Sequence, residues 1–251
     1  MIGFITATRT HAGHVRVCNE DGLVALPERG VWAVADGMGG HQRGDRASAL
    51  VVARLAALPA TAGGPDLLRA VEAALGACHR ELQETTAPGE ICGCTVVLLL
   101  VAEADFVCLW AGDSRLYRLR VGRRLERLTR DHSLVQELVD RGRLSPGAAR
   151  SHPWRNRITR ALGVGERLEL DAVQGRILAG DVFLLGTDGL TGEIEDAEIE
   201  RVLADAPPED AADRLLAMVL ARGARDNVTL VIVAAEEGAG GTLPPRPPVG
   251  S

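Results

Sequence analysis

The sequence predicts an α+β fold of layered β-sheets flanked by helices, because its strand-like and helix-like segments occur in groups. Short apolar runs separated by turn residues follow one another, at a spacing that fits antiparallel hairpins. Two amphipathic helical patterns lie directly one after the other, and a second such pair precedes the last apolar run. Together, the grouped strands and paired helices indicate the α+β class.

The individual elements follow from hydrophobic periodicity and from the residues that interrupt it. Strands are expected at residues 2–7, 22–26, 31–35, 92–101, 105–111, 115–120, 124–128, 167–174, 181–186 and 228–234. Helices are expected at 44–58, 65–84, 133–141, from 146, at 196–204 and at 208–221. The nearly all-apolar run 92–101 is typical of a strand buried on both faces. Asp105 and Asp131 are interpreted as a turn residue and a helix cap.

Length and composition favour one large domain. The chain has 251 residues, of which 46% are hydrophobic, so it can bury a sizeable core. No internal repeat or linker divides residues 1–235, which we predict to form a single domain. Residues 236–251 include GAGGTLPPRPPVGS, and this Gly- and Pro-rich segment is expected to be a disordered tail.

Charge and residue usage exclude several classes of function. The net charge of −6 offers no basic field for nucleic acid or for an anionic membrane surface. The longest apolar run, Thr95–Ala102, is far shorter than the ~20 residues of a membrane span. Together with an N-terminus that lacks a long apolar segment after a charged start, this predicts a cytoplasmic protein. An odd number of cysteines, five, mostly inside apolar patterns, predicts reduced, core-filling thiols more than a disulfide framework. All 28 basic residues are arginines, so no lysine-dependent phosphate loop or Schiff base is present.

Acidic residues recur at the ends of the predicted strands. They are Glu20, Asp21, Asp36, Asp113, Asp188 and Asp226. Each alone could be a turn residue, but repeated placement at strand ends indicates that they converge at one edge of the sheets. Clustered carboxylates repel one another unless a cation binds between them, and all-oxygen ligands favour Mg²⁺ or Mn²⁺. Two such ions could activate a water for attack on a phosphate ester.

The order of the motifs resembles that of the bacterial PPM family, the type 2C metal-dependent serine/threonine phosphatases. The matching segments are VRVCNEDG, VADGMGG, CGCTVV, AGDSRLYR, TRDHSLVQELVDRGRLSP, HPWRNRITRALG, LLGTDGL and RDNVTLVI. The resemblance covers residues 1 to about 235 and implies a PPM-type catalytic domain there. It also implies a four-layer α-β-β-α sandwich, with two central, mainly antiparallel sheets flanked by helix pairs.

The resemblance also implies a role for each acidic motif. Asp36 would bridge two Mn²⁺ or Mg²⁺ ions, and Gly37 would bind one of them through its backbone carbonyl. The remaining implied ligands are Glu20, Asp188 and Asp226 at the second metal site, and Asp113 with Asp188 at a third, more weakly bound ion. Around the ions, Asp21 would orient water, Asn227 would support the site, and Arg16 would bind the substrate phosphate. The catalytic residues are therefore expected to be Arg16 and Asp36.

One position departs from the pattern of many eukaryotic members of the family. They carry a histidine, the proposed general acid, where this chain has Met38. A methionine cannot donate a proton. Metal-bound water is then expected to protonate the leaving group.

The implied activity is hydrolysis of phosphoserine or phosphothreonine by direct attack of water. The implied partners are phosphorylated proteins, a bacterial serine/threonine kinase among them, with a role in regulating type VI secretion as one possibility, and the chain is expected to be a monomer. Substrate choice is expected to reside in the arginine-rich flap, residues 128–163. Two alternatives stay open: a catalytically silent module that binds phosphoproteins, and a hydrolase of small phosphorylated metabolites.

Overall fold

Eleven strands of the described chain form two antiparallel sheets. The computed structural model describes residues 2–39, 43–59, 64–87 and 89–237. The first sheet has the order β1-β11-β10-β7-β8, and the second has the order β2-β3-β5-β6-β9, with the short β4 paired to β3. The first sheet comprises β1 (Ile2–His11), β11 (Val228–Glu237), β10 (Val182–Gly186), β7 (Arg115–Leu119) and β8 (Glu126–Arg127). The second comprises β2 (Asp21–Leu26), β3 (Val31–Met38), β4 (Gly93–Cys94), β5 (Val96–Ala102), β6 (Asp105–Ala111) and β9 (Asp171–Arg176).

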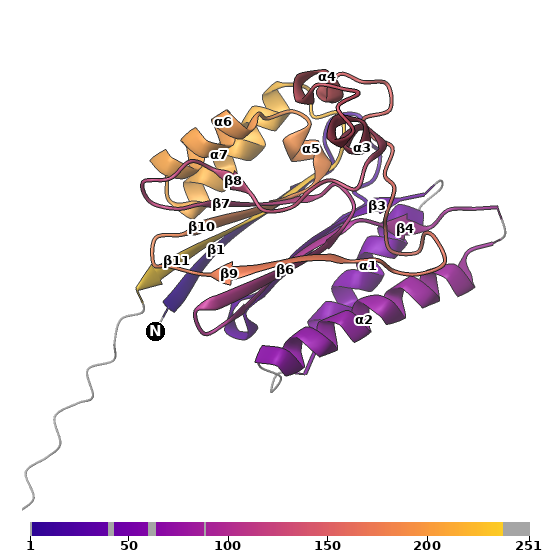
Figure 1. The fold of residues 1–251 in the computed structure, drawn as a ribbon, viewed down its shortest axis with the longest axis horizontal. Helices are drawn as coiled ribbons and strands as arrows, with labels where there is room; N and C mark the ends of the chain where they lie inside the picture. The colour runs from indigo at the N-terminus through magenta and orange to yellow at the C-terminus, as the bar shows by residue number, and fades with distance from the viewer. Residues whose placement is uncertain (1, 40–42, 60–63, 88, 238–251) are drawn as a thin grey trace, which may run out of the picture.

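Helix pairs cover the outer faces of both sheets (Figure 1). On the second sheet lie α1 (Arg43–Ala56) and α2 (Gly64–Thr85), and on the first lie α6 (Asp196–Asp205) and α7 (Pro208–Ala221). The short α3 (Leu134–Asp140), α4 (Pro146–Arg150) and α5 (Asp188–Thr191) lie together at one end of the sheets, and a 3-10 turn, η1 (Pro27–Arg29), joins β2 to β3.

Three clusters of buried apolar residues fill the spaces between the four layers. One joins α1 and α2 to their sheet, and another joins α6 and α7 to theirs. The third lies between the sheets and includes Trp32, Leu99, Phe183 and Val231, all fully buried. Alternate residues of the central strands therefore face helices on one side and the other sheet on the opposite side. This arrangement is the predicted four-layer α-β-β-α sandwich.

Several element boundaries differ from the predicted ones. The run 92–101 is not one strand, because Thr95 leaves the ladder between β4 and β5 to bind Asp36: its N–H donates to the Asp36 carbonyl at 2.9 Å. Helix α5 was not predicted. Its four residues are too few to show helical periodicity.

The start of α3 also corrects the sequence interpretation. Ser133, rather than Asp131, caps this helix, and its hydroxyl accepts the N–H of Gln136 at 3.3 Å.

At the other end of the chain, β11 continues to Glu237, because residues 236–237 pair with β1. The rest of the predicted tail, 238–251, lies outside the described residues. In the described ranges, no helix has the length and apolar character needed to cross a membrane.

Candidate active site

The predicted acidic residues meet at the end of the sheets where α5 begins. Asp21 and Asp36 are direct cross-strand partners on β2 and β3. Asp113 lies two residues after the end of β6, Asp188 opens α5 after β10, and Asp226 precedes β11. Because β10 and β11 are neighbours in the opposing sheet, side chains from both sheets come together across this end.

Asp36 is held by backbone contacts that leave its carboxylate available. Its N–H donates to Thr95 Oγ1 at 3.2 Å, and Thr95 Oγ1 in turn shares a hydrogen bond of 2.7 Å with Ser114 Oγ. The pKa of Asp36 is raised well above its usual range, first by burial and then by repulsion from Asp188, Asp21 and Asp113. A bound cation would reverse this unfavourable balance.

Glycine is required beside Asp36 because three backbone segments meet there. A Cβ on Gly37 would lie 2.1 Å from the Gly44 carbonyl oxygen and 2.5 Å from that of Glu20. The Gly37 N–H also donates to the Glu20 carbonyl at 3.1 Å. The glycine-rich turn thus lets the start of α1 and the Glu20 segment approach the end of β3.

Asp113 is buried and Asp188 is half-buried within the cluster. Burial is the main cause of the raised pKa of each, and the negative charge of Asp188 further raises that of Asp113. Asp113 Oδ1 is buried and has no hydrogen-bond partner among the described residues. An unpartnered buried carboxylate oxygen is costly, which makes this atom a candidate ligand.

Asp21 and Asn227 organise the surrounding loops. Asp21 Oδ2 accepts the Thr187 hydroxyl at 3.0 Å, and burial raises the pKa of Asp21 to about 7. Asn227 Oδ1 accepts the Glu20 N–H at 2.8 Å, while its amide donates to the carbonyls of Ala12 and Cys18, both at 2.9 Å. Asn227 therefore ties the 12–20 loop to the start of β11.

Arg16 lies at the open side of the same cluster. Its Nη2 donates to Asp226 Oδ2 at 2.7 Å, and half of its side chain (51%) is exposed. This bond raises the pKa of Arg16, so the guanidinium is charged at any physiological pH. A charged, accessible fork of donors beside an acidic cluster can bind phosphate oxygens.

The donor set fits hard divalent cations. In the described part of the chain, no three acidic, histidine or cysteine side chains are gathered closely enough to enclose one ion by themselves. An ion here would therefore also need backbone carbonyls or water, as Mg²⁺ and Mn²⁺ commonly use. The buried, unpartnered oxygens of Asp21 and Asp113 and the mutual repulsion of the carboxylates favour a positive occupant.

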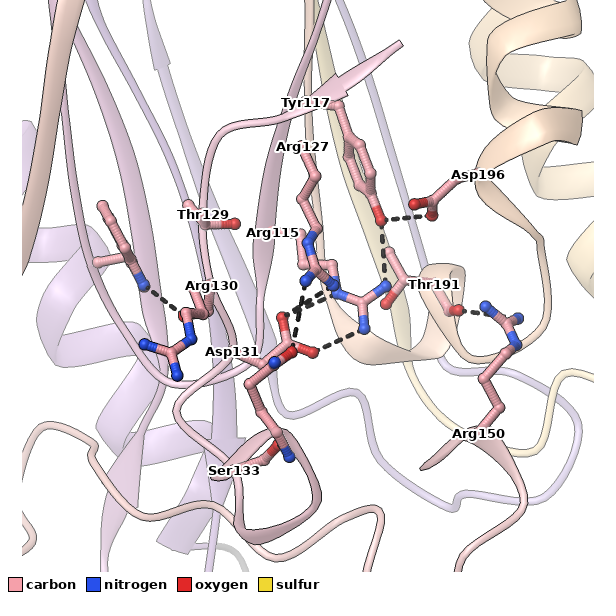
Figure 2. Close-up of polar contacts among 12 residues, drawn as sticks. Arg115, Tyr117, Arg127, Thr129, Arg130, Asp131, Ser133, Arg150, Thr191 and Asp196 are labelled. Carbon is pink, nitrogen blue, oxygen red and sulfur yellow. Dashed lines mark hydrogen bonds and ion pairs between the residues drawn. The ribbon is translucent and has the colours of Figure 1, made fainter. Parts of the chain in front are cut away.

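Sequence reasoning missed several residues that support the site. Ser114 and Thr187 adjoin Asp113 and Asp188 in the chain, so the AGDS and GTDG motifs contained the signal. Asp131 also has a supporting position: it accepts two hydrogen bonds from Arg115, at 2.9 and 2.6 Å. Figure 2 shows Arg115 between Asp131 and Tyr117, whose hydroxyl donates to Asp196 at 2.9 Å.

Two antiparallel sheets between helix pairs, with a carboxylate cluster at their common end, define a class of four-layer α-β-β-α proteins. Within this class, the chain belongs to the protein phosphatase 2C family, whose sequence model matches residues 10–229. It is 39% identical over 229 residues to the serine/threonine protein phosphatase PstP of Mycobacterium tuberculosis. That alignment covers 90% of this chain but 44% of PstP, so the chain spans less than half the length of this relative.

Solved structures agree with the fold. PppA, described as a key regulatory component of T6SS in Pseudomonas aeruginosa, superposes with a TM-score of 0.84 at 42% identity, over 93% of this chain and 98% of PppA. The catalytic domain of PstP, solved in complex with two manganese ions, gives a TM-score of 0.83 at 36% identity, over 94% of this chain and all of that one. These likenesses confirm the predicted family and fold.

Proposed function

We propose that this chain is a Mn²⁺- or Mg²⁺-dependent protein phosphatase that hydrolyses phosphoserine and phosphothreonine. The observation that carries the proposal is the meeting of Asp36, Asp188 and Asp226 with the half-exposed Arg16 at one end of the two sheets. The two manganese ions in the PstP catalytic domain support the choice of metal. The serine/threonine phosphatases among the relatives support the choice of substrate.

The ligand roles follow the donors at the site. Asp36 would contact both ions and Gly37 would contribute its carbonyl, while Asp188, Asp226 and Glu20 would complete the pair of sites. Asp113, with its unpartnered Oδ1, would share a third and weaker ion with Asp188. When bound, the ions supply an activated water for in-line attack on phosphorus.

The protein's own groups bind and orient the reactants. Arg16 holds the phosphate through its guanidinium, for which Asp226 is the partner in this structure. Asp21, fixed by Thr187, offers its free Oδ1 as an acceptor for water. Met38, at the end of β3, carries no dissociable proton, so the leaving alkoxide must be protonated by a group other than this side chain.

The test is release of phosphate from a phosphothreonine peptide with and without Mn²⁺. Activity that requires the metal and is lost in Asp36→Asn supports the proposal. A matched control is Asp105→Asn, because Asp105 lies at the opposite end of β6 and its side chain is 72% exposed. Peptide binding without phosphate release would instead favour a silent binding module. Turnover of small phosphate esters alone would favour a metabolite hydrolase.

The cellular setting belongs to the same proposal. We place the phosphatase in the cytoplasm, where the five free thiols would stay reduced, acting as a monomer through a domain of residues 1–235. Its partners would be a serine/threonine kinase and the proteins which that kinase phosphorylates. The likeness to PppA supports T6SS regulation as one setting. Loss of a kinase-dependent phosphorylation on expression of this chain, but not of Asp36→Asn, would test the pairing.

A further inference from the structure

The acidic cluster opens into a groove that extends well beyond it. The groove encloses about 930 Å³ and runs from Asp113, Asp188 and Asp226 between two walls. One wall is the flap with α3 and α4, and the other is formed by α5 and the start of α6. A space of this volume is larger than a phosphoryl group needs, so it can receive residues that flank the phosphorylated one.

The two walls differ in charge. The flap side, with β8, presents Arg127, Arg150 and Arg155. The facing side presents Glu193, Glu195 and Asp196, with one arginine, Arg225, beside Asp226. Two of these acids are already engaged. The Glu195 side chain caps its own helix, α6, and Asp196 accepts the Tyr117 hydroxyl at 2.9 Å. Glu193 differs from these two acids, because its carboxylate has no side-chain partner among the described residues.

On the flap side, Arg127 and Arg150 make only long contacts, and the Arg155 side chain has no hydrogen bond or ion pair among the described residues. Arg127 lies 3.8 Å from Asp131, but that carboxylate is already bound by Arg115. Arg150, the last residue of α4, has no carboxylate within ion-pair distance in the part of the chain that the structure describes. Its side chain instead extends to the opposite wall, toward Thr191 (Figure 2).

The contacts of Arg150 across the groove are long, and their acceptors are neutral carbonyls. Its Nη2 donates to the carbonyl oxygens of Thr191 at 3.4 Å and Ile194 at 3.5 Å. Strong N–H···O bonds are nearer 2.9 Å, and a guanidinium binds an ionised carboxylate, which can accept two parallel hydrogen bonds, more strongly than a neutral carbonyl. An incoming carboxylate would therefore displace both carbonyls at little cost.

We propose that Arg150 is a specificity-determining residue that binds one acidic side chain of the phosphoprotein substrate, in exchange for the Thr191 and Ile194 carbonyls. This inference rests on the proposed phosphatase function, because it assigns the sequence preference of that same site. Glu193 on the facing wall repels further negative charge, so the subsite takes one acidic residue and not an acidic run.

The experiment compares matched phosphothreonine peptides that carry glutamate or glutamine at each flanking position in turn. At one position, glutamate is expected to lower KM relative to glutamine by roughly tenfold, which is the effect of one charge-assisted contact, with kcat little changed. This preference should weaken as salt is added, because the contact is partly exposed.

Variants assign the preference to Arg150. In Arg150→Gln, the KM for the glutamine peptide divided by the KM for the glutamate peptide should fall to about one. In Arg150→Glu, the protein should instead prefer a peptide with lysine at that position. The matched control is Arg143→Gln, an exposed flap arginine outside the groove, which should keep the wild-type ratio.

Two results would overturn the inference: equal KM values for all glutamate and glutamine peptides, or a preference that survives in Arg150→Gln. Both of these results can be obtained only if the wild-type protein hydrolyses phosphopeptides. Failure to hydrolyse any phosphopeptide would instead count against the proposed function itself, so the two failures are distinguishable.

Discussion

Arg16 and Asp226 form an ion pair of 2.7 Å, although they lie 210 positions apart in the chain. The pair joins the residue assigned to the phosphate with one assigned to a metal ion. Arg16 and a divalent cation therefore compete for the same carboxylate, and this competition can be measured.

We expect Arg16→Ala to weaken catalysis and to tighten metal binding. Loss of a charged hydrogen bond to phosphate, worth about 1.5–3 kcal/mol, should lower kcat/KM by roughly 10- to 100-fold. Removal of the competing guanidinium should lower the Kd for Mn²⁺, measured by titration calorimetry. Unchanged or weaker Mn²⁺ binding would contradict the competition. Arg143→Ala, which lies outside the site, serves as the control.

Mn²⁺ should stabilise the fold because it neutralises buried carboxylates that repel one another. At about 100 times its Kd, a ligand specific for the folded state adds ~2.7 kcal/mol, equivalent to a rise in Tm of about 5–10 °C. In Asp188→Asn, the Tm of the metal-free protein should rise, because burial and the charge of Asp226 both oppose ionisation of Asp188. The further rise in Tm on addition of Mn²⁺ should be smaller than in the wild type.

The control for this experiment is Asp105→Asn, which removes an exposed acid far from the cluster and should leave both Tm values as in the wild type. A metal-free Tm that falls in Asp188→Asn would show that carboxylate repulsion is not what limits stability at the site.

Two buried histidines should make flap attachment depend on pH. Nδ1 of His79 accepts the Gly163 N–H at 3.0 Å, and Nδ1 of His132 accepts the Gly112 N–H at 3.1 Å. Burial lowers the pKa of both imidazoles below the usual 6.5. For a base with a lowered pKa, the stabilisation is complete above the unfolded pKa and is lost as pH falls through the folded pKa.

The contribution of these two bonds to stability in urea should therefore be constant from pH 8 to about 6.5 and decline below that value, by roughly 1 kcal/mol for each lost bond. The buried carboxyls with raised pKa values, Asp21 among them, act in the opposite direction, so the histidine contribution is measured as the difference between variants. Below pH 6.5, the double variant His79→Gln/His132→Gln should gain stability relative to the wild type, whereas replacement of the exposed His14 by Gln should preserve the wild-type slope. Equal slopes in all three proteins would refute the role of the two imidazoles.

Gly189→Ala should disrupt the site through backbone crowding. A Cβ at Gly189 would lie 1.9 Å from the Asn227 carbonyl oxygen, so the start of α5 must move away from β11. We expect a loss of about 1–3 kcal/mol in unfolding free energy, together with weaker Mn²⁺ binding, because Asp188 and Asp226 adjoin the displaced segments.

Gly76→Ala is the matched control for Gly189→Ala. Gly76 lies within α2, and a Cβ there would meet only the flexible end of Arg80 at 3.6 Å. Alanine should stabilise this helix by about 0.4–1 kcal/mol and leave metal binding unchanged. Chemical denaturation and Mn²⁺ titration of both variants would separate the effect of crowding from that of losing a glycine.

The sequence by itself determined the element types and the positions of the acids. Helical periodicity located α1, α2, α6 and α7, and apolar runs ended by Asp marked the strand ends that carry Asp36 and Asp188, because these signals depend on near neighbours in the chain. The grouping of strands and helices also predicted layered sheets flanked by helices. The resemblance of motif order then indicated the family.

Only the tertiary structure decided how distant segments meet. The break at Thr95 depends on its contact with Asp36 across two strands, and the pairing of Asp131 with Arg115 depends on how the flap folds back on β7. Likewise, the reach of Arg150 to Thr191 follows from α4 facing α5 across the groove. Such contacts depend on strand register and sheet packing, which no local pattern in the chain encodes.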